Sequence, residues 1–192
     1  MNQLVFYYGA MGSQKTARAL MTEYNYREKG FKTLLLKPSQ DTRDGRLTIR
    51  SRTGLSAEAE ILENFLEKYK MDQKVLEQAD ILIIDEVQFA KEEDIDLLAE
   101  ICDFHDKTIL CFGLRADFQN HFFSGSKRLM EIADELIEMK ALCFCGRPAI
   151  CNARYDKNGI VREGKQVELG ADDKYTALCR KHFKEGKLSA ND

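Results

Sequence analysis

The sequence predicts an α/β fold in which a parallel sheet carries helices on both faces, with a small β unit at the C-terminal end. Four short apolar segments read as buried strands and alternate with segments of helical periodicity. A glycine-containing loop follows the first of these strands directly, and four of the six cysteines come after residue 140. We therefore expect two units, residues 1–140 and residues 141–192.

The first strand, residues 4–8, runs into a loop that is close to the phosphate-binding pattern of Gly, four residues, then Gly-Lys-Ser/Thr. The chain departs from that pattern at Gln14, where the second glycine is expected. In such a loop, backbone amides surround phosphate oxygens, and the following helix points its positive end at the same anion. A strand-turn-helix corner with an exposed lysine is the alternative. The candidate phosphate-binding residues are Gly9, Ala10, Met11, Gly12, Ser13, Gln14, Lys15 and Thr16.

The first strand is followed by a helix over residues 17–29, which ends at Gly30, and by a second buried strand over residues 31–37. Together these elements form a right-handed βαβ unit. Asp41 and Arg43 come directly after the second strand, at the carboxyl end where α/β folds bind ligands. They are candidates for the phosphate site, although charges in such a polar stretch usually belong to a solvated loop.

The next segment, residues 58–69, has helical periodicity, although Ile61 and Leu62 could belong to a short strand. The stretch DILIIDE then places Asp85 and Glu86 at the end of a buried strand. Four apolar residues followed by Asp are typical of a Walker B strand, whose Asp holds Mg²⁺ beside the phosphate loop. A strand that runs into an acidic turn is the alternative. The two motifs together predict a P-loop NTPase-like (RecA-like) sheet.

A helix over residues 92–104 and a core strand over residues 108–113 follow, and we expect Cys102 and Cys111 to be core residues. The loop over residues 114–123 leaves the carboxyl end of that strand with several aromatic side chains. These side chains indicate the wall of a ligand pocket or a lid, with ordinary packing as the alternative.

The chain then changes from helical to β character. A helix is expected over residues 126–137, with Ser126 as its N-cap and Leu136 on its buried face. Residues 150–155 and 160–169 could form a hairpin-like pair, because the Asn-Gly between them is a turn signal.

Two pairs of possible metal ligands flank this β region. Cys143 and Cys145 lie on a tight turn, and Cys179 and His182 lie in a short helical segment. Two close ligands, a β excursion and two more close ligands are typical of a structural zinc site. Four unlinked residues, or Cys151 in place of one of them, are the alternatives. Because four protein ligands close the coordination sphere, the zinc would support structure and would not activate water.

The composition limits the class of protein. With 192 residues and 44% hydrophobic content, the chain is long enough for one core and a small appendage. A net charge of −3 gives no broad basic face for nucleic acid. The chain enters a strand at once, and no apolar run approaches ~20 residues. We expect a soluble, cytoplasmic protein with no nucleic-acid or membrane partner.

Several longer motifs make the chain similar to type II thymidine kinases, the cellular, tetrameric type with a zinc-bound small domain. The resemblance runs nearly end to end. It is carried by GAMGSQKT, PSQDTR, SRTGL, IDEVQF, GLRADFQNHFF, the Cys-x-Cys-Gly turn and QVELGADDKYTALCRKHF. It implies transfer of the γ-phosphate of ATP to the 5′-hydroxyl of thymidine or deoxyuridine, giving dTMP and ADP in deoxynucleoside salvage. It also implies a homotetramer with dTTP as feedback inhibitor.

The resemblance further implies a role for each site residue. Glu86 matches the general base, Asp85 and Thr16 match the magnesium side, and Lys15 with the loop amides matches the ATP phosphate site. Asp41, Arg43 and Gln88 are implied near the phosphates. The residues implied around the nucleoside are Met11, Glu86, Gln88, Phe89, Leu114, Phe118, Phe123, Val167, Glu168, Leu169, Gly170 and Tyr175. Residues 167–170 would read the thymine edge from a flexible lasso loop that covers the substrate.

The chain departs from the family pattern at two positions. Gln14 replaces a glycine of the phosphate loop, and Ala171 stands where many relatives have a second glycine in the lasso. Three rival functions fit the motifs less fully. They are another small P-loop kinase, an ATP-driven nucleic-acid-remodelling module in which Asp85 and Glu86 activate water, and a zinc-bearing nucleotide-binding protein without catalysis.

Overall fold

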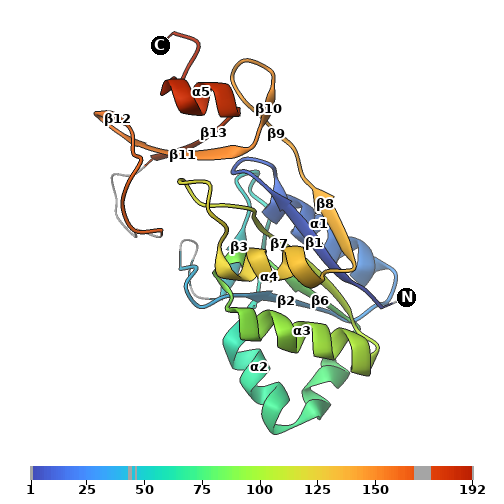
Figure 1. The fold of residues 1–192 in the computed structure, drawn as a ribbon. Coiled ribbons are helices and arrows are strands. Elements are labelled where there is room, and N and C mark those ends of the chain that lie inside the picture. The colour runs from blue at the N-terminus through green and yellow to red at the C-terminus, as the bar shows by residue number, and fades with distance from the viewer. Residues whose placement is uncertain (1, 43–44, 46, 167–173, 192) are drawn as a thin grey trace.

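The computed structural model describes residues 2–42, 45, 47–166 and 174–191, and within them the central element is a six-stranded sheet (Figure 1). The strand order is β5-β2-β6-β7-β1-β8, and every neighbouring pair is parallel. The strands are β1 (Leu4–Gly9), β2 (Thr33–Lys37), β5 (Glu60–Ile61), β6 (Ile81–Ile84), β7 (Thr108–Leu114) and β8 (Glu135–Glu138). The predicted parallel α/β sheet is therefore confirmed.

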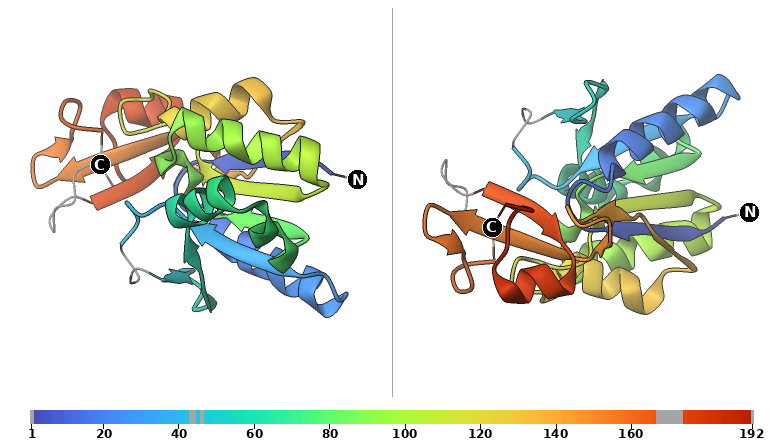
Figure 2. Two further views of the ribbon diagram at one scale, coloured as in Figure 1. Left: turned by 90° about the horizontal axis from the view of Figure 1, so that it is seen from below. Right: turned by 90° about the horizontal axis from the view of Figure 1, so that it is seen from above.

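Helices cover both faces of this sheet, as predicted (Figure 2). The helices and 3-10 turns of this part are α1 (Lys15–Glu28), α2 (Leu62–Met71), η1 (Gln73–Gln78), η2 (Val87–Phe89), α3 (Glu92–His105) and α4 (Ser124–Ile132). Successive side chains of a strand point to opposite faces. Accordingly, Phe6 packs in the cluster with α2, α3 and α4, whereas Val5 packs in the cluster with α1. Cys102 and Cys111 belong to the first cluster, as expected for core residues.

The predicted helix over residues 126–137 is wrong in its extent. Helix α4 ends at Ile132, Ala133 is extended, and the chain enters β8, which pairs with β1. Asp134 supports this change because its Oδ2 accepts the Leu4 amide at 2.7 Å. Leu136 therefore lies on an edge strand with 45% of its surface exposed, not on a buried helix face. The helical periodicity runs through the break, which is why the sequence did not reveal the sixth strand.

The N-cap prediction for this helix is also wrong. Helix α4 begins at Ser124, the N-cap position is Phe123, and Ser126 lies inside the first turn. Its buried hydroxyl donates instead to the carbonyl oxygen of Leu114 at 2.6 Å. Ser126 therefore ties the helix to the end of β7 and does not cap α4.

The polar stretch after β2 contains a small hairpin. Strand β3 (Thr48–Arg50) pairs antiparallel with β4 (Ser56–Glu58), and the chain then enters β5 and helix α2. The helix predicted from residue 58 starts only at Leu62, and Ile61 belongs to a short strand, which was the stated alternative for that residue.

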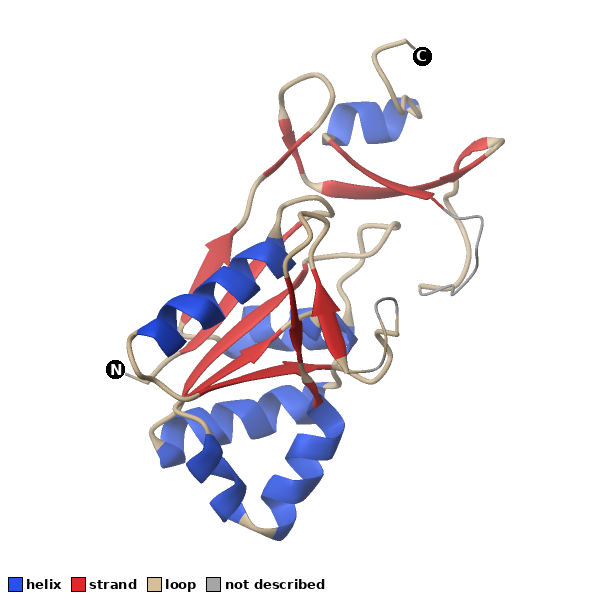
Figure 3. Cartoon of the chain, turned by 180° about the vertical axis from the view of Figure 1, so that it is seen from behind, coloured by secondary structure: helices blue, strands red, loops and turns tan. Residues whose placement is uncertain are grey.

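The C-terminal segment forms a separate β unit beyond one end of the sheet (Figure 3). Its elements are β9 (Ala141–Leu142), β10 (Pro148–Ala149), β11 (Cys151–Asp156), β12 (Gly159–Ile160), β13 (Lys174–Leu178) and α5 (Arg180–Glu185). The Asn-Gly turn joins β11 to β12, but β12 has only two residues, so the hairpin partner predicted over residues 160–169 is wrong within the described part. Strand β11 pairs mainly with β13, a contact distant in sequence.

This unit has its own apolar cluster, which includes the cysteine side chains of Cys143, Cys151 and Cys179. Ala10 of the phosphate loop packs in the same cluster, so the two parts of the chain share a small apolar contact. Among the described residues, no helix is both long enough and apolar enough to cross a membrane.

Candidate active site and metal cluster

The predicted phosphate loop joins β1 to α1. Gly9 ends the strand, and a Cβ at this position would lie 2.2 Å from the carbonyl oxygen of Met139, so the close approach of β8 requires glycine. Lys15 is 8% exposed, and its Nζ donates to the carbonyl oxygen of Ala10 at 2.8 Å and to Oγ of Ser13 at 3.0 Å. The lysine therefore folds back over its own loop.

Gln14 adopts the conformation for which glycine is usually selected. It precedes α1 with φ 61° and ψ 25°, in the left-handed region, and Gly12 has φ +74°. A residue with a Cβ is strained there by about 1–2 kcal/mol. The departure from the glycine pattern therefore leaves the loop path intact and makes it less favourable.

The predicted acidic pair lies at the carboxyl end of β6, directly beside the loop. Asp85 is buried, and its amide donates to the carbonyl oxygen of Leu36 at 3.0 Å. Glu86 is half-buried and has a left-handed backbone with φ 52°, a conformation that is uncommon for residues other than glycine. This turn directs the chain from β6 into η2 and lets Asp85 and Glu86 face the same cavity.

Gln88 orients the Glu86 carboxylate. Its Nε2 donates a hydrogen bond to Oε2 of Glu86, and its Oε1 accepts the Leu114 amide at 3.0 Å. Gln88 is 1% exposed, so neither bond competes strongly with water. The carboxylate at the end of β6 is thus tied to the end of β7.

Asp41 is held by a buried ion pair after β2. Its carboxylate lies 3.3 Å from Nζ of Lys37, a lysine with no exposed side-chain surface. Lys37 also donates to the carbonyl oxygens of Gly45 and Thr48, which fixes the loop that follows. Arg43, which was predicted near the phosphates together with Asp41, lies outside the described residues.

These elements enclose a cavity of about 780 Å³. Its lining unites the predicted phosphate loop, the acidic pair, Asp41 and Leu114. The lining residues are Met11, Gly12, Gln14, Lys15, Thr16, Ala17, Asp41, Ile49, Arg50, Ser51, Arg52, Thr53, Gly54, Asp85, Glu86 and Leu114. Residues from the ends of β1 and β6 and from the loop after β2 therefore meet at one site, as expected for the carboxyl edge of a parallel sheet.

The β3–β4 hairpin contributes residues that were not among the predicted site residues. Arg50 and Arg52 line the cavity. Ser51, between them, holds the turn from β3 to β4: its amide donates to the carbonyl oxygen of Leu55, and its hydroxyl bonds that of Thr53. The signal in the sequence is two arginines two residues apart that follow the phosphate motifs, but only the hairpin brings them to the loop.

The aromatic residues expected near a ligand are mostly packed. Phe89 and Phe123 form an edge-to-face pair with ring centroids 5.7 Å apart. Phe118 is 2% exposed, and the guanidinium carbon of Arg154 lies 4.0 Å from its ring centroid. Tyr175 stands opposite Arg154 in the pairing of β11 with β13, so the two side chains lie on the same face of that small sheet.

The loop over residues 114–123 is also tied to the segment before the gap in the described chain. Asp117 accepts the amides of Gln119 and His121 through Oδ1, at 2.8 and 2.9 Å, and accepts Nε2 of Gln166 through Oδ2 at 2.9 Å. Gln119 donates in turn to the carbonyl oxygen of Arg162 at 3.1 Å. The predicted residues Val167, Glu168, Leu169 and Gly170, and also Ala171, lie outside the described residues.

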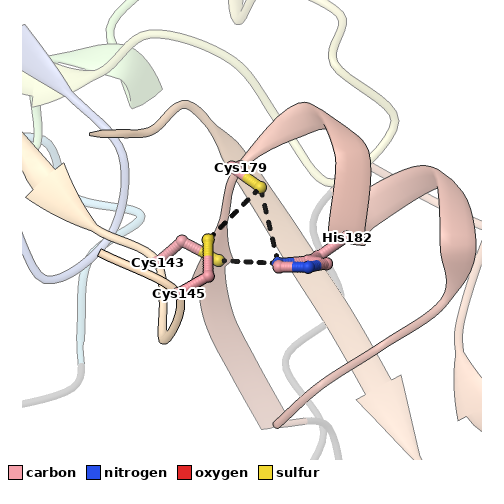
Figure 4. A group of neighbouring side chains, drawn as sticks. All are labelled: Cys143, Cys145, Cys179 and His182. Atoms are coloured by element: carbon pink, nitrogen blue, oxygen red, sulfur yellow. Dashed lines mark hydrogen bonds between the residues drawn. The ribbon is translucent and has the colours of Figure 1, made fainter. Parts of the chain in front are cut away.

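The four predicted metal ligands come together in the C-terminal unit (Figure 4). Their ligand atoms all lie within 4.8 Å of one another. Nδ1 of His182 is 3.4 Å from Sγ of Cys143 and 3.5 Å from Sγ of Cys179, and Sγ of Cys145 is 4.0 Å from that of Cys179. A tetrahedral zinc separates its sulfur and nitrogen ligands by about 3.6–3.8 Å. The cluster therefore fits a metal ion of that kind.

Local structure prepares these ligands. Gly146, with φ +80°, closes the Cys-x-Cys turn, and its amide donates to the carbonyl oxygen of Cys143 at 2.9 Å. The Phe144 ring stacks on the His182 imidazole at 4.4 Å. Burial raises the pKa of the Cys143 thiol, but hydrogen bonds from the Cys145 and Cys179 amides and from His182 outweigh it and lower that pKa to about 6. A thiolate, the form that binds metal, is therefore available at neutral pH.

Cys151 is not part of this cluster. It is 3% exposed, and burial raises the pKa of its thiol, so it behaves as a core residue of the unit. The alternative in which Cys151 replaces one of the four ligands therefore has no support from the geometry.

Sequence comparisons relate the chain to known proteins. It matches the sequence model of the family described as thymidine kinase (TK) over residues 2–183. Thymidine kinase from Legionella pneumophila (strain Lens) is 44% identical over 191 residues, 97% of this chain and 91% of that protein. Thymidine kinase from Zymomonas mobilis (strain ZM4) is 43% identical over 96% of this chain and 97% of its own. Thymidine kinase from Enterobacteria phage T4 is 42% identical over the same two shares.

Proposed function

Because the chain belongs to the thymidine kinase family and is a thymidine kinase of type II, we propose that it transfers the γ-phosphate of ATP to the 5′-hydroxyl of thymidine, with Glu86 as general base. The observation that carries this proposal is the single cavity that Lys15, Thr16, Asp85 and Glu86 line together. Phosphoryl transfer needs positioning and charge neutralisation more than covalent chemistry, and these four side chains supply both.

Each side of the reaction has candidate residues. The amides of the loop over residues 9–16 and Lys15 would hold the ATP phosphates, with Lys15 exchanging its bonds within the loop for phosphate oxygens. The Thr16 hydroxyl and the Asp85 carboxylate would hold Mg²⁺, because both side chains offer oxygens to the cavity. When bound there, the ion would neutralise charge on the transferred phosphate. Asp41 and Arg43 are proposed beside the same phosphate.

The acceptor side is proposed to be the wall formed by the β7–α4 loop and the C-terminal unit. Glu86 would take the proton of the 5′-hydroxyl, and Gln88 would hold its carboxylate in place. The nucleoside is proposed to contact Met11, Phe89, Leu114, Phe118, Phe123, Tyr175 and the backbone of Val167, Glu168, Leu169 and Gly170. A loop that covers the base and excludes water would favour transfer to the sugar over hydrolysis.

The metal cluster is proposed to hold zinc with a structural role. Cys143, Cys145, Cys179 and His182 would occupy all four positions of a tetrahedral ion, so no open position remains for substrate or water. Residues 1–140 would form the kinase domain, and residues 141–192 the zinc-binding domain with the lasso loop.

Further properties rest on the family alone and are part of the same proposal. They are phosphorylation of deoxyuridine, a place in pyrimidine deoxynucleoside salvage, a homotetramer and feedback inhibition by dTTP. A cytoplasmic location is proposed from the six cysteines, which are all free thiols in the described chain.

A nucleoside panel tests the activity. Purified protein is incubated with MgATP and each nucleoside in turn, and the nucleoside monophosphates are separated and quantified. We expect dTMP from thymidine, dUMP from deoxyuridine and no product from purine nucleosides. ATP hydrolysis that DNA stimulates, with no nucleoside product, would instead support a nucleic-acid-remodelling function.

A further inference from the structure

Asn152, a buried residue of β11, bridges two loops of the proposed active site. It is 4% exposed. Its Oδ1 accepts the amide of Met11 at 2.8 Å, and its Nδ2 donates to the carbonyl oxygen of Ala116 at 2.7 Å. A main-chain amide only donates and a carbonyl only accepts, so this orientation of the side chain is the one that satisfies both groups. Neither the sequence motifs nor the metal cluster account for this residue.

One end of this bridge lies in the phosphate loop. Met11 is the third residue of the loop, next to Ala10, whose carbonyl oxygen accepts Lys15 Nζ. Lys15 therefore bonds within the loop, whereas Asn152 holds the loop from outside, from strand β11. This outer support has added weight because Gln14 keeps a left-handed backbone without the help of glycine.

The backbone of Asn152 connects this bridge to the metal cluster. Strand β11 carries Asn152 opposite Ala177 of β13, and the neighbouring pair is Cys151 with Leu178. The next residue after Leu178 is the ligand Cys179. Ala10 also packs in the apolar cluster that contains Cys143 and Cys179, so contacts of two kinds join the phosphate loop to the metal-bearing unit.

We propose that Asn152 is a positioning residue that holds the phosphate loop to the metal-bearing unit, so that metal occupancy and ATP affinity are coupled through its hydrogen bond to Met11. This proposal rests on the proposed function, because it takes the loop to be the ATP site. Metal bound by Cys143, Cys145, Cys179 and His182 would fix the end of β13 next to Cys179. Because β13 pairs with β11, this would also fix the position of Asn152, whose Oδ1 accepts the Met11 amide.

A binding cycle tests the coupling. The Kd for MgATP is measured by calorimetry for the wild type, Asn152→Ala, Cys145→Ser and the double variant, each with its metal content and melting curve. Asn152→Ala is expected to raise the Kd about tenfold, because a buried amide loses its acceptor. Cys145→Ser is expected to raise it several-fold in the wild type and much less in the Asn152→Ala background. Asn158→Ala, in the exposed turn of the same unit, is the matched control and should leave the Kd unchanged.

The outcomes separate this proposal from the proposed function. Wild-type protein that does not bind MgATP contradicts the proposed function. Wild-type binding that Asn152→Ala leaves unaltered overturns the proposal about Asn152. If the double variant raises the Kd for MgATP by the product of the two single effects, the coupling is overturned. A Cys145→Ser protein that binds MgATP as tightly as the wild type also overturns it.

Hydrogen exchange on the wild type decides the matter even if Asn152→Ala does not fold. The exchange rate of the Met11 amide is measured by NMR before and after the metal is removed with a chelator. We expect at least tenfold faster exchange after removal. The Leu4 amide, at the other end of β1 and bonded to Asp134, is the internal control and should keep its rate. Unchanged protection of the Met11 amide without metal would refute the coupling.

Discussion

Nε2 of Gln88 donates a hydrogen bond to Oε2 of Glu86, and Oε1 of the same amide accepts the main-chain N–H of Leu114 at 3.0 Å. The carboxylate proposed as general base is therefore held by a side chain that is itself fixed at the end of the neighbouring strand β7. A base acts efficiently only when its oxygen stays within hydrogen-bond reach of the proton that it removes. Four of the predictions below concern this arrangement and the loop beside it.

Replacing Gln88 by leucine should reduce catalysis and stability together. Gln88→Leu removes the donor to Glu86 and leaves the partly buried Leu114 amide without its acceptor, so the free energy of unfolding should fall by about 1–3 kcal/mol. The kcat should fall roughly tenfold, because the carboxylate loses its orientation. Steady-state kinetics and chemical denaturation measure the two effects. Gln78→Leu, on the exposed face of η1, is the control and should change neither quantity; a Gln88→Leu enzyme with wild-type kcat would rule out the orienting role.

Gly113 leaves room for this glutamine. A Cβ at that position would lie 2.8 Å from Oε1 of Gln88 and 2.9 Å from Cγ1 of Val87. We expect Gly113→Ala to lower the free energy of unfolding by about 1–3 kcal/mol and to lower kcat by displacing Gln88. Gln88→Ala removes the nearest contact but also the acceptor of the Leu114 amide, so the double variant should be destabilised by less than the sum of the two single changes. If the double variant is as unstable as the two changes summed, the clash does not involve the Gln88 side chain.

The phosphate loop should improve when its glycine is restored. Gln14 has a left-handed backbone, so Gln14→Gly should raise the free energy of unfolding by about 1 kcal/mol by relieving strain. Gln14→Gly should also tighten MgATP binding, because the loop would reach its binding conformation without the strain of a left-handed residue that carries a Cβ. Melting curves and calorimetric titration provide the measurements. Gln14→Ala keeps the Cβ and serves as the control; equal gains in the two variants would show that the Gln14 side chain, and not the backbone strain, limits the loop.

Metal analysis distinguishes the two possible ligand sets. We expect about one zinc per chain in the wild type and in Cys151→Ala, because Cys151 lies outside the cluster. His182→Ala should lose the zinc and unfold at a temperature lower by several degrees, since one of four ligands is gone. Metal content is measured by atomic emission and stability by calorimetry. Loss of zinc from Cys151→Ala would move Cys151 into the ligand set.

Most of the sheet could be predicted because its strands are continuous apolar runs. Residues 81–84 are apolar at every position and flanked by charged residues. This one pattern predicts a strand, its burial on both faces and the position of Asp85 at its carboxyl end. Strand β8 could not be predicted in this way, because Leu129, Ile132 and Leu136 keep a helical spacing across the break at Ala133. Residues 135–138 form a strand because they pair with the edge of β1, which is a contact distant in sequence.

The candidate site could be predicted where its residues belong to a local sequence motif. It could not be predicted where residues distant in sequence come together only in the folded chain. The positions of Lys15, Asp85 and the four candidate metal ligands could be predicted from their motifs, because each group is close in sequence or ends a strand. Arg52 reaches the cavity only through the β3–β4 hairpin, and Asn152 reaches the phosphate loop across 141 positions of sequence. The SRTGL motif contains Arg52 but does not show that it reaches the cavity, and no local pattern marks the contact of Asn152.

If Glu86 takes the proton from the 5′-hydroxyl of thymidine, the Glu86→Gln variant should lose phosphoryl transfer and keep ligand binding. The variant keeps size and hydrogen bonding but removes the base. In single-turnover experiments with MgATP and thymidine, we expect transfer to slow at least about 100-fold, while the Kd values for MgATP and thymidine stay within about twofold. Glu77→Gln, on the exposed surface, should behave as the wild type. Transfer at the wild-type rate by Glu86→Gln would contradict the account.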